Sequence, residues 1–140
     1  MKKMYATDWT LLLLFALAAG SGMARHAAGH GGDAATGQLL AILHTATGSL
    51  FLVTAIVHAA MHRNWYKGFV KYGAGKRSKI TAALSVAFLL VSATGIVLIG
   101  RNGAHSPVGL WHYKIGIATT LLAIAHIIKR FALLRKASKR

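Results

Sequence analysis

Four histidines in two apolar segments form the pattern with the clearest chemical meaning. His44 and His58 lie 14 residues apart in one segment, and His112 and His126 lie 14 residues apart in another. Because an α-helix turns about 100° per residue, both histidines of a pair face the same way, about 21 Å apart along the axis. Imidazole is a common ligand of transition metals. Two parallel helices marked in this way are predicted to hold two flat, metal-centred cofactors stacked through a membrane.

Each first histidine is followed by a glycine four residues later, namely Gly48 and Gly116. These glycines lie one turn away on the same helix face, as do Ala55 and Ala123, and small residues there would make room beside a broad cofactor. Small residues also allow close helix packing in membranes, and this alternative is compatible with the first. Histidines at membrane depth usually have a function, although some only form hydrogen bonds between helices. The identical spacing of all four favours metal ligation.

The composition limits which cofactors the chain can hold. The 140 residues suit a single domain, 1–140; they are 55% hydrophobic, and they contain 17 Lys and Arg but no cysteine. The absence of cysteine excludes disulfides, iron–sulfur clusters and the thioether attachment of c-type haem. Any haem must therefore be held without thioether links. The net charge of +15 lies between the apolar segments, so we expect no binding of nucleic acid.

Four segments are long and apolar enough to span a bilayer, at about 5–24, 37–61, 80–100 and 110–128, followed by a basic tail, 129–140. The start of the chain also resembles a signal peptide, but we expect it to be a retained helix. Because lipid offers no partners to unpaired backbone groups, the segments must be helical. The sequence predicts an all-α, transmembrane four-helix bundle.

The basic residues predict the orientation of these helices. They occupy the first residues of the chain, the gap 62–79 and the tail, whereas Arg25 and Arg101 are on the opposite side and Lys114 lies just inside the fourth helix. By the positive-inside rule, both termini are cytoplasmic in a multi-pass protein of the inner membrane. Contacts with lipid headgroups are sufficient to explain the basic loops.

The two halves of the chain resemble each other as two helical hairpins. The segment 11–22 parallels 84–95, and each is followed by a loop and a histidine pair. One crossing separates the second helix from the fourth, so these two helices run in the same direction. His44 and His112 are then predicted to share an outer level, and His58 and His126 an inner level.

His62 is a second candidate for the inner level. It lies 18 residues after His44, which is five full turns, so it occupies the same helix face. The matching position in the fourth helix is Arg130, which cannot ligate iron. This comparison favours His58 as the ligand, with His62 as a headgroup, propionate or quinone-site residue.

Cations near each level are candidates for binding haem propionates, because guanidinium groups suit carboxylates. They are Arg25, Arg101 and Lys114 at the outer level, and Arg63 and Arg130 at the inner level. A topology or snorkelling role is an equal alternative for each.

The remaining polar residues belong to the loops. His26, His30 and His105, with Asp33, could bind zinc or copper or line a docking surface, and their spacing does not decide between these roles. Neither Asp8 nor Asp33 is expected at membrane depth, so no carboxylate proton relay is expected, and no catalytic set for hydrolysis or group transfer is visible.

The paired histidines on two parallel helices resemble the di-haem core of the respiratory cytochrome b proteins. The four-helix length and the stretch His58-Ala-Ala-Met-His62-Arg-Asn-Trp65 are similar to a small bacterial cytochrome b-like membrane family, some of whose members are called flavinylation-associated cytochromes. The resemblance covers about 5–130. It implies two b haems with bis-histidine ligation by His44, His58, His112 and His126. It also implies electron transfer between quinone or quinol and an extracytoplasmic redox partner.

Such a protein would be an electron-transfer subunit of a membrane oxidoreductase. Two alternatives remain at this point: a zinc or copper transporter or binder that uses the same histidines, and a structural membrane subunit in which they only pack.

Overall fold

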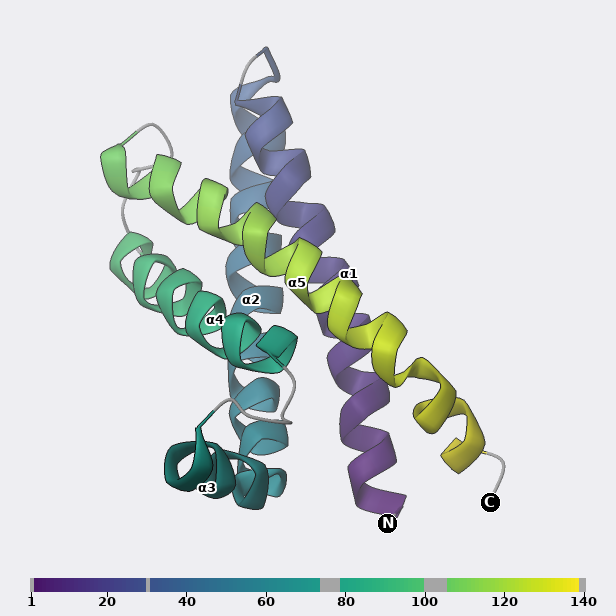
Figure 1. The fold of residues 1–140 in the computed structure, drawn as a ribbon. Coiled ribbons are helices and arrows are strands. Elements are labelled where there is room, and N and C mark those ends of the chain that lie inside the picture. The colour runs from purple at the N-terminus through teal and green to yellow at the C-terminus, as the bar shows by residue number, and fades with distance from the viewer. Residues whose placement is uncertain (1, 30, 74–78, 100–105, 139–140) are drawn as a thin grey trace.

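The computed structural model describes residues 2–29, 31–73, 79–99 and 106–138, and the side chains of these residues between 5 and 131. In these ranges the regular elements are five helices: α1 (Lys2–Ala28), α2 (Ala34–Met61), α3 (Arg63–Tyr72), α4 (Lys79–Leu98) and α5 (Pro107–Ser138). The prediction of an all-helical chain is confirmed in the described part of the molecule (Figure 1).

Four of these helices are long and apolar enough to cross a membrane, over Tyr5–Ala28, Ala34–Met61, Lys79–Leu98 and Pro107–Phe131. The predicted membrane-spanning segments are therefore present, with α1 and α5 longer than expected. The helix α5 continues into the segment predicted as a basic tail. That segment contains Lys, Arg, Ala and Leu, which are good helix formers, and no Gly or Pro interrupts it.

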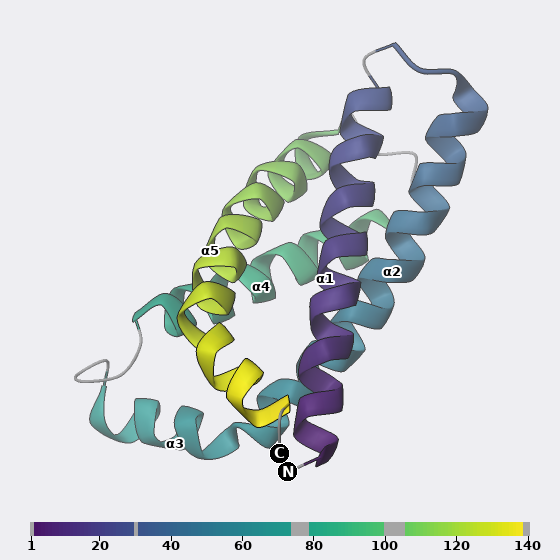
Figure 2. The same cartoon turned by 90° about the vertical axis from the view of Figure 1, so that its right-hand side faces the viewer.

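The helix α3 was not expected, because the gap 62–79 was interpreted as a basic loop. Its basic side chains recur every four residues, at Arg63, Lys67 and Lys71. On another side of the helix Trp65 stacks on Phe69, with ring centroids 5.4 Å apart and planes at 13°. Separate basic and aromatic faces are typical of a helix that lies in a membrane interface. Figure 2 shows α3 lying across the end of the molecule where α1 begins.

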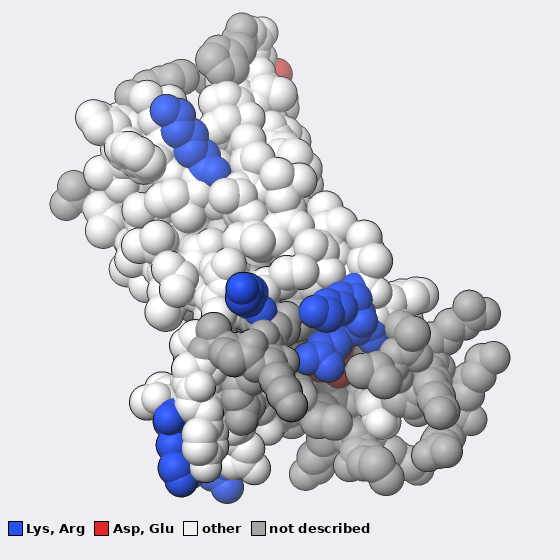
Figure 3. Space-filling view, in the orientation of Figure 1, with Lys and Arg blue, Asp and Glu red and all other residues white. Residues whose placement is uncertain are grey.

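The long helices form two hairpins. The helix α1 packs along α2, α4 packs along α5, and the hairpins meet mainly where α1 touches α5. Figure 1 shows the α4–α5 hairpin crossing the α1–α2 hairpin obliquely, with the start of α1 and the later turns of α5 near the same end. In this arrangement α2 and α5 both run toward the end that carries α3. Figure 3 shows much of the Lys and Arg surface gathered toward that end.

Few side chains are buried between the helices. Among the described residues, the buried apolar side chains are Ala18 and Ala123, and the buried polar side chains are Ser21, Thr47 and Thr119. The three hydroxyls donate hydrogen bonds to carbonyls one turn earlier in their own helices. Large apolar side chains are instead exposed on the outside, which is the surface that a lipid environment requires.

Side-chain caps fix the starts of the two helices that carry the histidine pairs. At α2, the Asp33 carboxylate accepts hydrogen bonds from the Thr36 backbone N–H at 2.8 Å and from its hydroxyl at 2.6 Å. These bonds lower the pKa of Asp33. At α5, the Ser106 hydroxyl accepts from the Gly109 N–H at 3.1 Å, and Pro107 occupies the first turn.

Candidate functional site

The structure brings His44 of α2 and His112 of α5 together at the predicted outer level. Their ring centroids lie 6.0 Å apart, with an angle of 71° between the planes. A metal bound by two imidazoles, with bonds of about 2.0 Å and each nitrogen about 1.1 Å from its ring centre, separates the ring centres by about 6.2 Å. The observed centroid separation is close to this value.

The hydrogen bond of the His44 ring defines its tautomer. The Nδ1 of His44 lies 3.0 Å from the Ala18 carbonyl oxygen, which can only accept, so Nδ1 carries the proton and the lone pair for a metal is on Nε2. The Nδ1 of His112 lies 3.0 Å from the Thr94 hydroxyl oxygen, and which of these two atoms donates depends on the tautomer of the ring.

The inner level contains a carboxylate that the sequence analysis did not place there. The Asp8 Oδ1 of α1 lies 2.9 Å from the Nδ1 of His58. The Nδ1 of His126 lies 3.3 Å from the Thr81 hydroxyl of α4, and His126 is within electrostatic range of His58 and Asp8. Asp8 was not expected at membrane depth, but it lies one turn into the candidate span of α1, and its side chain reaches His58 on the neighbouring helix α2.

His62 also lies at this level, where α2 ends. Its ring centroid is 4.7 Å from that of His58. Desolvation, reinforced by the neighbouring His58, lowers the pKa of His62. Among the described hydrogen bonds, the one that Asp8 makes with a histidine is to His58 and not to His62, so these two candidate inner ligands have different surroundings.

The partners of the four histidines repeat with a constant offset. Asp8 and Thr81 are 73 residues apart, as are Ser21 and Thr94. In each hairpin the first helix carries the partner and the second helix carries the histidine. Ser21 makes such a contact with His44, because its hydroxyl lies 3.4 Å from Nδ1 of that ring. The internal repeat therefore includes the surroundings of the histidines as well as the histidines themselves.

Two glycines of the first helices allow the outer rings to lie against the backbone. A Cβ added to Gly22 would lie 2.8 Å from Cε1 of His44, and one added to Gly95 would lie 3.0 Å from Cε1 of His112. Both distances are shorter than an ordinary contact. Gly22 and Gly95 end the two segments that mark the internal repeat, 11–22 and 84–95, and lie 73 residues apart.

The glycines predicted to make room for a cofactor have open surroundings. A Cβ added to Gly48 would meet nothing within 4 Å, and one added to Gly116 would meet only Cγ2 of Val91, at 3.9 Å. Two facing imidazoles can bind a metal, and the open space beside Gly48 and Gly116 lies one turn along each helix. Together these features fit a broad, planar, metal-centred group.

Among the described residues, an arginine lies within electrostatic range of each histidine level. Arg25 acts on both His44 and His112, and Arg130 acts on His62 and His126. Of the other predicted cations, Arg63 and Lys114 are exposed, as is Arg130.

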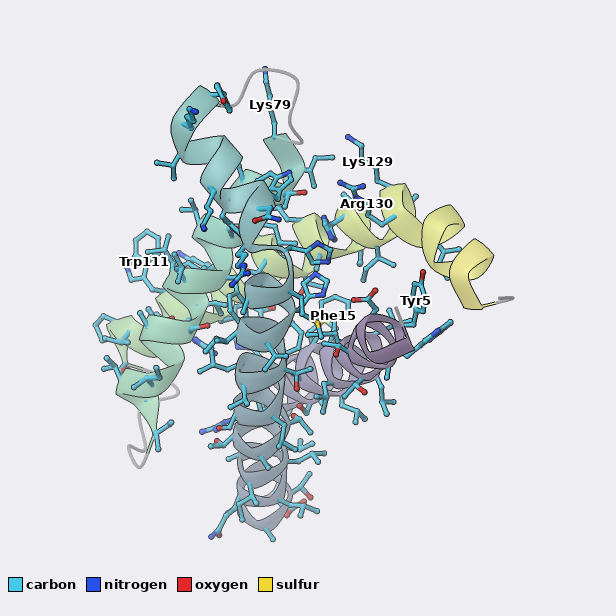
Figure 4. All side chains as sticks on the ribbon, turned by 90° about the horizontal axis from the view of Figure 1, so that it is seen from below. Tyr5, Phe15, Lys79, Trp111, Lys129 and Arg130 are labelled. Carbon is cyan, nitrogen blue, oxygen red and sulfur yellow. The ribbon has the colours of Figure 1, made fainter. Side chains whose placement is uncertain are left out.

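Lys114 lies over a ring on its own helix, with Nζ 5.6 Å from the centroid of Trp111. Figure 4, viewed from the end where α1 begins, shows Trp111 pointing away from the other helices. Arg101 lies outside the described residues.

Three phenylalanines lie between the two levels. Phe51 is seven residues from both His44 and His58. Its ring centroid is 6.2 Å from that of Phe15 in α1 and 5.7 Å from that of Phe88 in α4. In Figure 4 Phe15 points toward α2. This aromatic cluster links the hairpins at half the distance between the histidine levels.

The outer loop residues are only partly described. His26 stacks on Tyr113 with ring centroids 3.6 Å apart, and Asp33 is engaged as a helix cap. His30 and His105 lie outside the described residues. The described part of the chain contains no group of three or more His, Cys, Asp or Glu that could hold a metal ion. Paired histidines suit haem iron, which takes two axial ligands, better than tetrahedral zinc.

A comparison of the chain with models of protein families, with curated proteins and with solved structures finds no match.

Proposed function

We propose that this protein is a membrane b-type cytochrome with two haems in a four-helix bundle. His44 and His112 hold the outer haem, and His58 and His126 hold the inner one. The protein passes electrons across the bilayer between a quinone or quinol and a redox partner protein, as the electron-transfer subunit of a membrane oxidoreductase. The observation that carries the proposal is that each of the four histidines has a polar partner at Nδ1, with the ring centroids of His44 and His112 6.0 Å apart.

The side chains around each histidine prepare it for ligation. A hydrogen bond that holds the proton on Nδ1 fixes the ring orientation and leaves Nε2 as the ligand atom, as is usual for metal-bound histidines. When bound, haem supplies reversible one-electron exchange at its iron. Arg25 and Arg130 provide one cation near each level for the haem propionates.

The hydrogen bond between Asp8 and His58 also supports His58 over His62 as the inner ligand. A carboxylate on Nδ1 orients an imidazole and raises its basicity. Asp8 supplies this contact to His58. His62, at the end of α2, is better placed to interact with a propionate, a lipid headgroup or a quinone.

The apolar exterior and the basic end support the proposed location. Four apolar helices fit a multi-pass protein of the inner membrane. The Lys and Arg residues near α3 support a cytoplasmic position for that end and for both termini, in contact with anionic lipid.

The proposal is tested by a reduced-minus-oxidised spectrum and a pyridine haemochrome assay of the purified chain, with two b haems expected. His44→Ala and His126→Ala should each remove one haem, and not the same one. His62→Ala is the control and should retain both. A colourless protein with bound zinc or copper would favour the metal-ion alternative, and a colourless, metal-free, folded protein would favour a structural subunit. Loss of one shared haem from both alanine variants would contradict the pairing by level.

A further inference from the structure

Among the described residues, the two histidine levels differ in one carboxylate. The described arginines in electrostatic range are Arg25 at the outer level and Arg130 at the inner level. The outer rings have neutral partners, a carbonyl and hydroxyls. At the inner level, the Asp8 carboxylate accepts from Nδ1 of His58 at 2.9 Å. The chain's other carboxylate, Asp33, is engaged at the start of α2, eleven residues before His44 and about 16.5 Å away along the axis.

A carboxylate on Nδ1–H makes an imidazole a stronger electron donor, and its negative charge favours the more positively charged ferric iron. Second-shell hydrogen bonding is one of the protein's main controls on haem potential. Among the described residues each level has an arginine in range, whereas the Asp8 carboxylate contacts a histidine only at the inner level. The inner level should therefore be harder to reduce than the outer level.

We infer that Asp8 is a positioning residue that makes the inner haem the lower-potential one and so drives electrons from the inner level to the outer level. The step is the transfer of one electron from ferrous iron at the inner level to ferric iron at the outer level. No bond forms or breaks, and the Nδ1 proton of His58 remains hydrogen bonded to Asp8. This inference rests on the proposed di-haem function and adds its direction.

The experiment measures the midpoint potential of each haem separately, by spectroelectrochemical titration of the full chain in detergent. His44→Ala leaves only the inner haem, and His126→Ala leaves only the outer one. Asp8→Asn is added to each, because the asparagine oxygen still accepts from Nδ1–H while the charge is lost. In the His44→Ala background Asp8→Asn should raise the midpoint potential by at least 59 mV, a tenfold change in the one-electron equilibrium. In the His126→Ala background it should leave the potential unchanged.

Asp33→Asn is the matched control, since it removes the same charge from a helix cap that asparagine also satisfies. It should shift neither potential. An unchanged inner potential in the Asp8→Asn protein, or an equal shift at both levels, would overturn the inference while leaving the two haems in place. A wild-type chain that binds no haem would instead overturn the proposed function.

A gain-of-charge variant covers the case in which Asp8→Asn loses its inner haem. Thr94→Asp places a carboxylate on Nδ1 of His112, where the threonine hydroxyl lies at 3.0 Å. In the His126→Ala background, this substitution should lower the outer potential by a similar amount. No shift there would show that the Nδ1 carboxylate does not control the potential, and would overturn the inference.

Discussion

Replacing Gly22 by alanine tests whether the outer histidine depends on its close approach to α1. The new Cβ would lie 2.8 Å from Cε1 of His44, whereas ordinary contacts begin at 3.4 Å, so the ring must retreat by about 0.6 Å. The ring is hydrogen bonded to the Ala18 carbonyl at 3.0 Å, and the same movement directly away would stretch that bond to about 3.6 Å, beyond hydrogen-bond range. Overpacking of this kind costs about 1–3 kcal/mol.

The matched control is Gly20→Ala in the same helix, where the added Cβ meets nothing within 4 Å. Both substitutions gain about 1 kcal/mol of helix propensity, so their difference isolates the steric effect. Relative to Gly20→Ala, Gly22→Ala should weaken retention of the outer haem roughly 5- to 150-fold. Gly95→Ala, with a closest distance of 3.0 Å to His112, should have a smaller effect in the same direction.

The assay is the haem content of the purified variants during dilution into detergent containing a haem scavenger, with circular dichroism to confirm that the helices remain. Equal haem retention by Gly22→Ala and Gly20→Ala would refute the reasoning, because it would show that the His44 ring moves freely or is not a ligand.

Three further outcomes follow from other contacts. Gly48→Leu and Gly116→Leu should each lower the haem content without loss of helix, since each fills space beside the histidine face; full haem content in both would show that the cofactor lies elsewhere. Because its hydrogen bonds to Thr36 hold the pKa of Asp33 below 3.8, its cap should stabilise the start of α2 above that pH and be lost as the pH falls through the folded pKa. Hydrogen exchange of the Thr36 amide should therefore accelerate in acid, and an unchanged acid response in Asp33→Ala would refute the cap. Phe51→Ala should lower stability by about 2 kcal/mol, less than the 3–5 kcal/mol of a fully buried phenylalanine, with both haems retained; loss of either haem would assign Phe51 a direct role.

The long helices and the facing of His44 and His112 could be predicted because both depend on periodicity. Apolar length predicts spans, and a 14-residue interval in helices that run the same way brings equivalent histidines to one level. The ends of the helices were less predictable. The segment 129–138 was assigned as a tail from its charge, although its residues are good helix formers.

The surroundings of the histidines were not predicted, for reasons that differ between residues. Asp8 was not expected at membrane depth, and its contact with His58 depends on how closely the neighbouring helix packs. Extending the repeat back from Gly22 and Gly95 would have paired Asp8 with Thr81 and indicated a shared position. The close contacts of the two glycines depend on helix separation, which a single sequence does not specify.

The constant offset between the histidine partners has a consequence for the symmetry of the molecule. Two hairpins that enter and leave the membrane in the same sense are related by a pseudo-two-fold axis along the membrane normal. Such an axis exchanges His44 with His112, and the partners Ser21 with Thr94, but it never exchanges one membrane face with the other. The inner partners are not matched in this way, because Asp8 of α1 and Thr81 of α4 occupy equivalent positions but differ in charge. Within the inner level the two hairpins therefore give their histidines different environments.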